Sequence, residues 1–420
     1  MPRIFLRALL LGVLAILAAC SSPPLVPDSG PATGAQAPVT VPEATIADSA
    51  ARALGSKFAA VGWGELPGWA NDDLRGVWTT FLRNCAGLMR PTAINLAGPT
   101  RATPRAWQAV CAAATDPARA PAANNPEAVR KFLQTWLAPW RLDGADGKPA
   151  SSIVTGYYEP LVVGSRKQGG VYQWPLYTVP ADLLTIDLGK VYPELAGKRV
   201  RGKLEGNRVV PYDSRASLEA SARKPPVVVW VNDPVDNFFL QVQGSGRVQL
   251  NDGPGAGQTI RVAYADHNGH PYVSIGKWLA DKGEMQLSQT SMQSIREWAK
   301  RNPKRVPEML NANPRFVFFK ELPSNVSADL GPIGALGVSL TAERSIAIDL
   351  KAMPLGAPVF LSTTKPLSSQ ILQKLVMAQD TGKAIVGGVR ADYYWGSGDS
   401  AGELAGRMKQ DGKMWLLLPR

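Results

Sequence analysis

The sequence predicts a mainly β fold with peripheral helices, in which one β barrel is interrupted by a second β-rich module. Glycine and proline are frequent, with 40 and 35 residues in a chain of 420, and both favour short strands joined by turns. Runs rich in β-branched and aromatic residues begin at Ile153 and continue to about residue 265. Strand-like runs return at 315–319 and 358–361 after a helical interval.

The first twenty residues have the features of a secretory signal. Arg3 and Arg7 precede an apolar run that ends in Leu17-Ala18-Ala19-Cys20, and this order is typical of a signal peptide. The last four residues also resemble the lipobox of bacterial lipoproteins, which implies lipidation of Cys20 and a lipid anchor on the periplasmic face of a Gram-negative outer membrane. An ordinary signal peptide with an incidental cysteine is the alternative.

The sequence predicts a flexible tether after the signal segment and a basic surface on the folded part. Residues 21–45 are rich in Pro, Ala, Ser, Thr and Gly and lack the large apolar side chains needed to offset the entropy of folding. The net charge of +12 suits a polyanionic surface such as cell wall or membrane, or serves solubility alone. Because no dense Lys/Arg run is interleaved with aromatic residues, we expect no nucleic-acid partner.

Two amphipathic helices are predicted before the first strands. Residues 72–82 place apolar side chains on one stripe with acids in the first turn. Residues 126–137 begin with proline, which is favourable in a first helical turn. Cys85 and Cys111 form either one disulfide in an oxidising periplasm or two buried thiols.

Further strands are predicted at 226–231 and 237–243, where apolar runs are bounded by Gly, Pro and Asp, as in antiparallel barrels. A helix is predicted over 291–299, and a last strand over 414–418.

Three aspartates near the C-terminus form the predicted chemical centre. Asp349, Asp380 and Asp392 each follow small or apolar residues and precede a turn that contains glycine. This is the pattern of acids placed at strand ends where a loop opens to solvent.

Several other chemistries have little support. The chain has neither a Gly-rich phosphate loop nor a Cys-x-x-Cys pair, which argues against nucleotide hydrolysis and structural zinc. His267 and His270 flank an Asn-Gly turn that does not fix both rings on one face. We therefore expect no metal site and no cofactor, and no serine nucleophile elbow is present.

Carboxylate chemistry on a saccharide is what remains. Aromatic residues stand beside acids in Asp392-Tyr393-Tyr394-Trp395 and Tyr157-Tyr158-Glu159; rings stack on sugar faces while a carboxylic acid protonates a glycosidic oxygen. For any single acid, a turn or cap role is the alternative. The acids concerned are Asp349, Asp380, Asp392, Asp399, Glu159 and Glu403.

Several motifs resemble the membrane-bound lytic murein transglycosylase A family, including the three aspartates of its C-terminal three-aspartate domain. The similarity extends over about residues 60–420. The motifs are Gly156-Tyr157-Tyr158-Glu159-Pro160, the run 236–246 from Asp236 to Gly246, Tyr272-Val273-Ser274-Ile275-Gly276, Ser291-Met292-Gln293, Gly331-Pro332-Ile333-Gly334 and Leu340-Thr341-Ala342.

The resemblance implies a domain organisation. It predicts a double-psi β-barrel domain formed by residues 46–160 and 323–420, an inserted β-barrel domain over 161–322, and a glycan groove between them. The signal peptide occupies 1–20 and the tether 21–45.

The resemblance also implies an activity and the residues that carry it. The family cleaves the β-1,4 bond between N-acetylmuramic acid and N-acetylglucosamine and leaves a 1,6-anhydromuramoyl end. Its single catalytic aspartate corresponds to Asp392, with Asp380 and Asp349 as supporting residues and a raised pKa expected for Asp392. The predicted substrate-binding residues are Tyr158, Glu159, Gln243, Gly244, Ser245, Tyr272, Tyr393 and Trp395.

Three other functions stay open. A hydrolysing muramidase would use Glu159 or Asp380 to activate water, and a non-catalytic wall-binding lipoprotein would use the same aromatic groove. A lipoprotein scaffold for cell-wall synthesis proteins would leave the aspartates unexplained. The expected partners are peptidoglycan strands, the outer membrane through the anchor and, for the scaffold, those synthesis proteins. The roles of Arg390 and Asp399, close to the predicted catalyst in sequence, are also open.

Overall fold

The computed structural model describes residues 57–90, 104–143, 150, 152–195, 200–323, 330–350, 352–382, 385–387 and 390–420. The predicted signal peptide, Cys20 and the tether lie outside these ranges. Within them, no helix is both long and apolar enough to cross a membrane.

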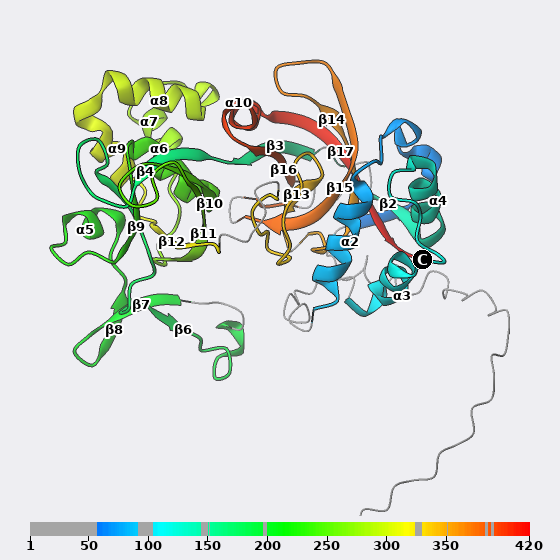
Figure 1. Ribbon diagram of the computed structural model, residues 1–420, viewed down its shortest axis with the longest axis horizontal. Coiled ribbons are helices and arrows are strands. Elements are labelled where there is room, and N and C mark those ends of the chain that lie inside the picture. Colours follow the sequence, from blue (N-terminus) through cyan, green and yellow to red (C-terminus); the bar gives the residue numbers. More distant parts are fainter. Residues whose placement is uncertain are drawn as a thin grey trace, which may run out of the picture. The chain divides into compact units, whose positions relative to one another are not determined.

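Six strands close into a barrel, which confirms a mainly β fold (Figure 1). The ring closes because β17 is long: its first residues pair with β3, and its later residues pair with β14 and β2. Two of the pairings, β13 with β15 and β16 with β3, are parallel, and the other four pairings of the ring are antiparallel. In ring order the strands are β3 (Ser152–Glu159), β16 (Arg390–Ser397), β13 (Ser345–Ile348), β15 (Ile371–Thr381), β14 (Pro358–Thr364) and β17 (Lys409–Pro419).

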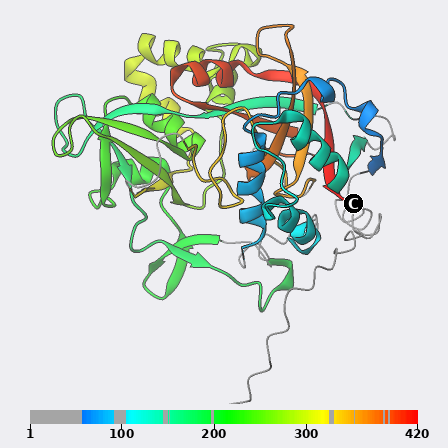
Figure 2. The ribbon, with the colours of Figure 1, turned by 45° about the vertical axis from the view of Figure 1, so that its right-hand side comes forward.

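Two further strands and three helices surround this barrel. β1 (Lys57–Ala60) and β2 (Leu137–Asp143) extend the sheet beyond β17. The helices α2 (Val77–Leu88), α3 (Pro104–Thr115) and α4 (Pro126–Trp136) share its largest hydrophobic core and appear in blue to cyan in Figure 2. A disulfide joins Cys85 of α2 to Cys111 of α3. The helix predicted over 126–137 is confirmed as α4, whose cap Asn125 accepts two backbone N–H bonds.

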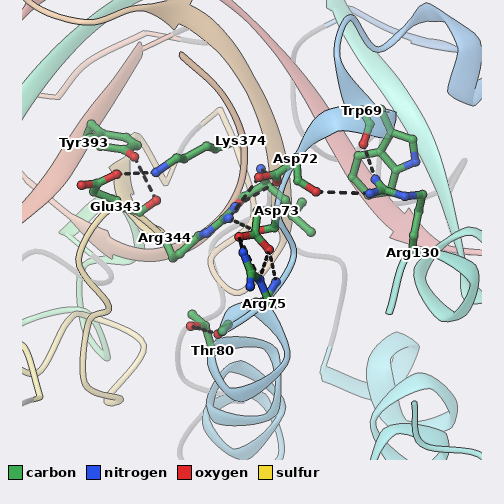
Figure 3. Close-up of polar contacts among 12 residues, drawn as sticks. Trp69, Asp72, Asp73, Arg75, Thr80, Arg130, Glu343, Arg344, Lys374 and Tyr393 are labelled. Carbon is green, nitrogen blue, oxygen red and sulfur yellow. Dashed lines mark hydrogen bonds and ion pairs between the residues drawn. The ribbon is translucent and has the colours of Figure 1, made fainter. Parts of the chain in front are cut away.

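The helix predicted over 72–82 begins only at Val77, and the expected acids in its first turn are wrong. Gly76 precedes α2 in the left-handed conformation, which interrupts the helical run. Asp72 is extended instead, because its carboxylate is held elsewhere (Figure 3). It accepts two hydrogen bonds from Arg344 and one from the Leu375 amide of β15, at 2.9, 3.0 and 2.7 Å. This network ties the segment before α2 to the barrel.

A second sheet of six strands is nearly closed. Its first and last strands, β12 and β5, contact each other without pairing, and β3 leads into β4 through Pro160 alone. In sheet order the strands are β12 (Val317–Glu321), β11 (Thr259–His267), β10 (Ser245–Asp252), β4 (Leu161–Ser165), β9 (Val227–Val231) and β5 (Trp174–Tyr177). A separate meander contains β6 (Leu184–Ile186), β7 (Val200–Glu205) and β8 (Arg208–Pro211).

The strand predicted over 237–243 is wrong, because these residues belong to helix α6 (Pro234–Gln243). Asp233 caps its first turn by accepting the Val235 and Asp236 amides, and Gly244 ends it at φ 78°. The helix predicted over 291–299 is confirmed as α8 (Met292–Arg301). The remaining helices are α5 (Arg215–Ala220), α7 (Ile275–Asp281), α9 (Val306–Asn311) and α10 (Asp399–Arg407).

Candidate active site

The barrel register brings two of the three aspartates together. Ala347 of β13 pairs with Asp380 of β15 on one side and with Asp392 of β16 on the other. Asp392 in turn pairs with Thr155 of β3. Residues paired in register present their side chains to the same face of a sheet. Four neighbouring strands therefore place both carboxylates and the Thr155 hydroxyl on one face, with Asp349 directly after β13.

Hydrogen bonds hold each aspartate. The Thr155 hydroxyl donates to Oδ1 of Asp392 at 2.7 Å. Asp380 accepts the Tyr157 hydroxyl at 3.2 Å and the Ala335 amide at 2.9 Å. Asp349 accepts the amide of Gly387 at 2.8 Å. Each carboxylate is thus oriented by a donor from a different segment of the chain.

Burial raises the pKa of both barrel aspartates. The pKa of Asp392 lies above its ordinary value because desolvation outweighs the Thr155 hydrogen bond and the positive charge of Arg390. The pKa of Asp380 rises to about 6, mainly through burial and further through the charge of Asp392. Burial and both carboxylate charges hold the pKa of Tyr157 well above its ordinary value. A protonated carboxyl close to neutral pH is therefore attainable here.

Glu159 is engaged in a buried ion pair at the end of β3. Its two oxygens accept from Arg247 of β10 at 2.9 Å and from Arg261 of β11 at 3.1 Å. A carboxylate shared by two guanidinium groups is a strong link between segments. Glu159 therefore connects the barrel strand to the second sheet, and its predicted role in substrate binding stays a prediction.

Three aromatic residues predicted to bind substrate lie in the hydrophobic core. Tyr158, Tyr393 and Trp395 are all buried members of the largest core cluster. The Tyr393 hydroxyl donates to the backbone carbonyl of Glu343 at 2.9 Å (Figure 3). Successive strand side chains alternate between faces, so Tyr393 and Trp395 point away from the face of Asp392.

Four of the predicted substrate-binding residues belong to the part of the chain around the second sheet. Three of them lie together at the junction of α6 and β10, and the fourth lies elsewhere. Gln243 ends α6 and accepts the Tyr158 amide at 3.4 Å, which brings it beside β3. Gly244 follows as the helix cap, and Ser245 begins β10. Tyr272 is exposed in the segment between β11 and α7.

The remaining sequence candidates are not at this site. Asp399 is exposed at the start of α10, and Glu403 pairs with Arg407 on the same helix at 3.4 Å. His267 accepts the Gly269 amide, and His270 contacts the Tyr212 carbonyl at 2.7 Å. Over the part of the chain that the structure describes, no group of three His, Cys, Asp or Glu residues is arranged to hold a metal ion.

Sequence reasoning missed Thr155, and it noted Tyr157 and Tyr394 beside the acids without predicting a site role for either. Tyr157 and Tyr394 pair in register, and their rings lie 5.2 Å apart. The signal was period-two alternation: Tyr394 is two residues after Asp392, and Thr155 and Tyr157 share a strand face. The sequence pattern does not show that β3 is the strand that pairs with β16.

The fold and the site together define a β-barrel protein with two buried aspartates paired on one face of the barrel sheet. Family models match residues 153–320 as an MltA specific insert domain and residues 344–418 as a 3D domain. Membrane-bound lytic murein transglycosylase A of Escherichia coli K12 is 32% identical over 296 residues, which are 69% of this chain and 71% of the relative. This chain belongs to the membrane-bound lytic murein transglycosylase A family.

Solved structures of relatives agree with this assignment. A monoclinic crystal structure of MltA from Neisseria gonorrhoeae is 37% identical and covers 87% of this chain and 93% of its own, with a TM-score of 0.71. A structure of Escherichia coli MltA with bound chitohexaose is 27% identical and covers 86% and 94%, with a TM-score of 0.61.

Proposed function

We propose that this protein is a lytic transglycosylase that cleaves the β-1,4 bond between N-acetylmuramic acid and N-acetylglucosamine in peptidoglycan. The observation that carries the proposal is Asp392, a carboxyl of raised pKa that is oriented by Thr155 and lies in register beside Asp380. Relatives named lytic murein transglycosylases and a relative with bound chitohexaose support the reaction and the glycan ligand.

In the proposed reaction, protonated Asp392 gives its proton to the glycosidic oxygen as the bond from that oxygen to C1 breaks. The C6 hydroxyl of the same muramic acid residue then attacks C1, and the Asp392 carboxylate accepts the hydroxyl proton. A 1,6-anhydro ring closes, and no water is consumed. Intramolecular attack of this kind reaches effective molarities of about 10⁵ M or more, so a single acid–base group is sufficient.

Asp380 and Asp349 are proposed to support the catalyst. Asp380 shares its face with Asp392, and the charge of Asp392 contributes to the raised pKa of Asp380. A negative charge there would favour the protonated form of Asp392 and the positive charge that develops at C1. Asp349, held by Gly387, lies beyond the end of β13.

The state of Glu159 argues against hydrolysis through that residue. Hydrolysis needs a second carboxylate free to activate water. Glu159 is buried between two arginines, which leaves Asp380 as the acid that a hydrolysing enzyme would have to use. We further propose the domain boundaries given above, a glycan groove between the two domains, and a lipid anchor at Cys20 in the outer membrane.

The test is mass spectrometry of peptidoglycan digested by the native chain, Asp392→Asn and the matched control Asp399→Asn. Asparagine keeps the shape of the side chain and still accepts from Thr155, so folding is retained. We expect anhydromuramoyl ends from the native chain and the control, and a rate lower by about 10²–10⁴-fold for Asp392→Asn, the usual contribution of acid–base catalysis.

The possible outcomes separate the alternatives. Reducing muramic ends from the native chain would show a hydrolysing muramidase. Glycan binding by the native chain without any turnover would show a wall-binding protein. An unchanged rate in Asp392→Asn would remove Asp392 from the mechanism.

A further inference from the structure

The meander of β6, β7 and β8, seen as a ribbon in Figure 1, has two faces whose side chains differ in chemistry. The register pairs Leu204 with Val209, and Ile186 with Val200. Side chains alternate between the two faces along a strand. Residues two positions away from Leu204, Val209, Ile186 or Val200 on the same strand therefore lie on the same face of the meander. One face therefore carries only apolar side chains around Gly202, namely Leu184, Ile186, Val200, Leu204, Val209 and Pro211.

The opposite face is polar apart from Val210, which pairs with Lys203, and it is the face bound to the rest of the protein. Arg201 pairs with Asp266 of β11 at 2.9 Å, and Lys203 pairs with Asp213 at 2.8 Å. At Gly269 the backbone comes so close to Arg201 that an added Cβ would lie 2.7 Å from the Arg201 Cβ. The absence of a side chain at Gly269 lets the meander and the β11 turn pack together.

This arrangement reverses the usual order of a surface sheet, in which the apolar face is buried and the polar face meets water. Val200, Leu204 and Val209 are 54%, 61% and 49% exposed. Among the residues that the structure describes, none of the six side chains belongs to a hydrophobic core cluster. The apolar face points outward while the polar face is the packed one, which makes the apolar face a candidate contact surface.

We propose that the apolar face of the meander docks on the surface of an anionic phospholipid bilayer. Its size argues against a protein partner: three strands about 4.8 Å apart and about four residues long span roughly 150–200 Å², far below the ~800 Å² per partner of a stable interface. Its side chains carry no aromatic ring for a sugar and no hydrogen-bonding group. Aliphatic groups without polar partners suit the acyl boundary of a membrane.

The charge of the whole chain suits an anionic membrane, because its net charge is +12. Lys190 and Tyr192 are exposed in the segment that follows β6, whereas Arg208 pairs with Glu205 on the polar face. Cationic side chains near such a surface contribute to binding, and tyrosine is enriched at membrane interfaces.

The proposed anchor makes weak docking sufficient. Cys20 precedes Lys57 by 37 residues, and a flexible coil of that length spans about 30–36 Å. A domain tethered at this range meets its membrane at an effective concentration in the millimolar range, so a millimolar surface affinity would already fix its orientation. The meander would then be a second contact that orients the inserted domain on the bilayer.

The experiment uses the mature chain with Cys20→Ser, which keeps every described residue and removes the lipid. Flotation with vesicles of phosphatidylethanolamine and phosphatidylglycerol measures binding. The test variant is Leu204→Ser with Val209→Ser, and its matched control is Val171→Ser with Ile371→Ser, two residues outside the meander that are 63% and 65% exposed. All four positions are at the surface, and thermal melting checks that each variant is folded.

We expect the native chain and the control to float with anionic vesicles and to bind neutral phosphatidylcholine vesicles more weakly. The test variant should bind anionic vesicles at least about tenfold more weakly, which equals about 1.4 kcal/mol, and should cleave peptidoglycan in solution at the native rate. Equal flotation of the test variant and the native chain would overturn the proposal. So would absence of native flotation together with self-association that the serine pair abolishes, which would assign the face to a second copy.

Discussion

Replacing Asp72 by asparagine should destabilise the protein far more than the same change at its neighbour Asp73. Asp72 and Arg344 form an ion pair with side chains only 2% and 11% exposed. The pair is bidentate, and Asp72 also accepts the Leu375 amide (Figure 3). Asp73 pairs with Arg75 instead, at 53% and 69% exposure. The two changes are chemically identical and differ in burial.

The expected loss of unfolding free energy depends on which partner groups each substitution leaves without a counter-charge. Asparagine at position 72 can still accept the Leu375 amide, but the Arg344 guanidinium loses its counter-charge. Removing one partner of a buried ion pair costs about 3–5 kcal/mol. Arg344 keeps the carbonyls of Leu375 and Asp73 as acceptors, so we expect the lower end, about 3 kcal/mol. An exposed pair contributes little, so Asp73→Asn should be nearly silent.

Urea unfolding followed by circular dichroism and tryptophan fluorescence measures both free energies. A double-mutant cycle with Arg344→Gln isolates the coupling, which for residues in contact is about 0.5–3 kcal/mol. Equal midpoints for Asp72→Asn and Asp73→Asn, or a coupling near zero, would refute the reasoning. The barrel would then not depend on this link between the segment before α2 and β15.

Three further changes test the site and the helical layer. Asp380→Asn should gain stability relative to the native chain as pH rises from 4 to 7. The pKa of Asp380 is about 6 in the folded protein against an ordinary value of 3.8. The native protein therefore loses up to about 3 kcal/mol of its free energy of unfolding as the Asp380 carboxyl loses its proton. Urea titrations at pH 4 and pH 7 measure the difference between the two chains. Tyr157→Phe removes a hydrogen bond that lowers the pKa of Asp380, so carboxyl NMR titration should show that pKa above 6. Replacing Cys85 and Cys111 by serine should cost about 3.5 kcal/mol for a sequence separation of 26 residues, measured by unfolding without reductant.

The main elements were predictable where local pattern and tertiary packing agree. The helix at 126–137 was found because its proline start and apolar spacing match its buried face. The run Phe238-Phe239-Leu240 was assigned to a strand because aromatic and branched residues favour strands. The cap at Asp233 and the left-handed Gly244 override that preference, and the Asp-Pro start and the Gly end were visible in the sequence.

The catalytic candidate was predictable, but its surroundings were not. Asp392 and its partner Thr155 are 237 residues apart in sequence, and only strand pairing brings them together. The same holds for Tyr157 and Asp380, which are 223 residues apart. No local pattern states which strand neighbours which, because register depends on packing across the whole barrel.

Packing in the core gives Tyr393 and Trp395 a role different from the one predicted for them. A slip of one residue in a strand moves every side chain to the other face. If β16 slipped against β13, Asp392 would enter the core, and Tyr393 and Trp395 would leave it. The buried ring contact between these two aromatics, with centroids 4.9 Å apart, and the Tyr393 hydrogen bond to Glu343 therefore oppose the slip. The aromatic residues beside Asp392 fix the register that keeps Asp392 on the same face as Asp380.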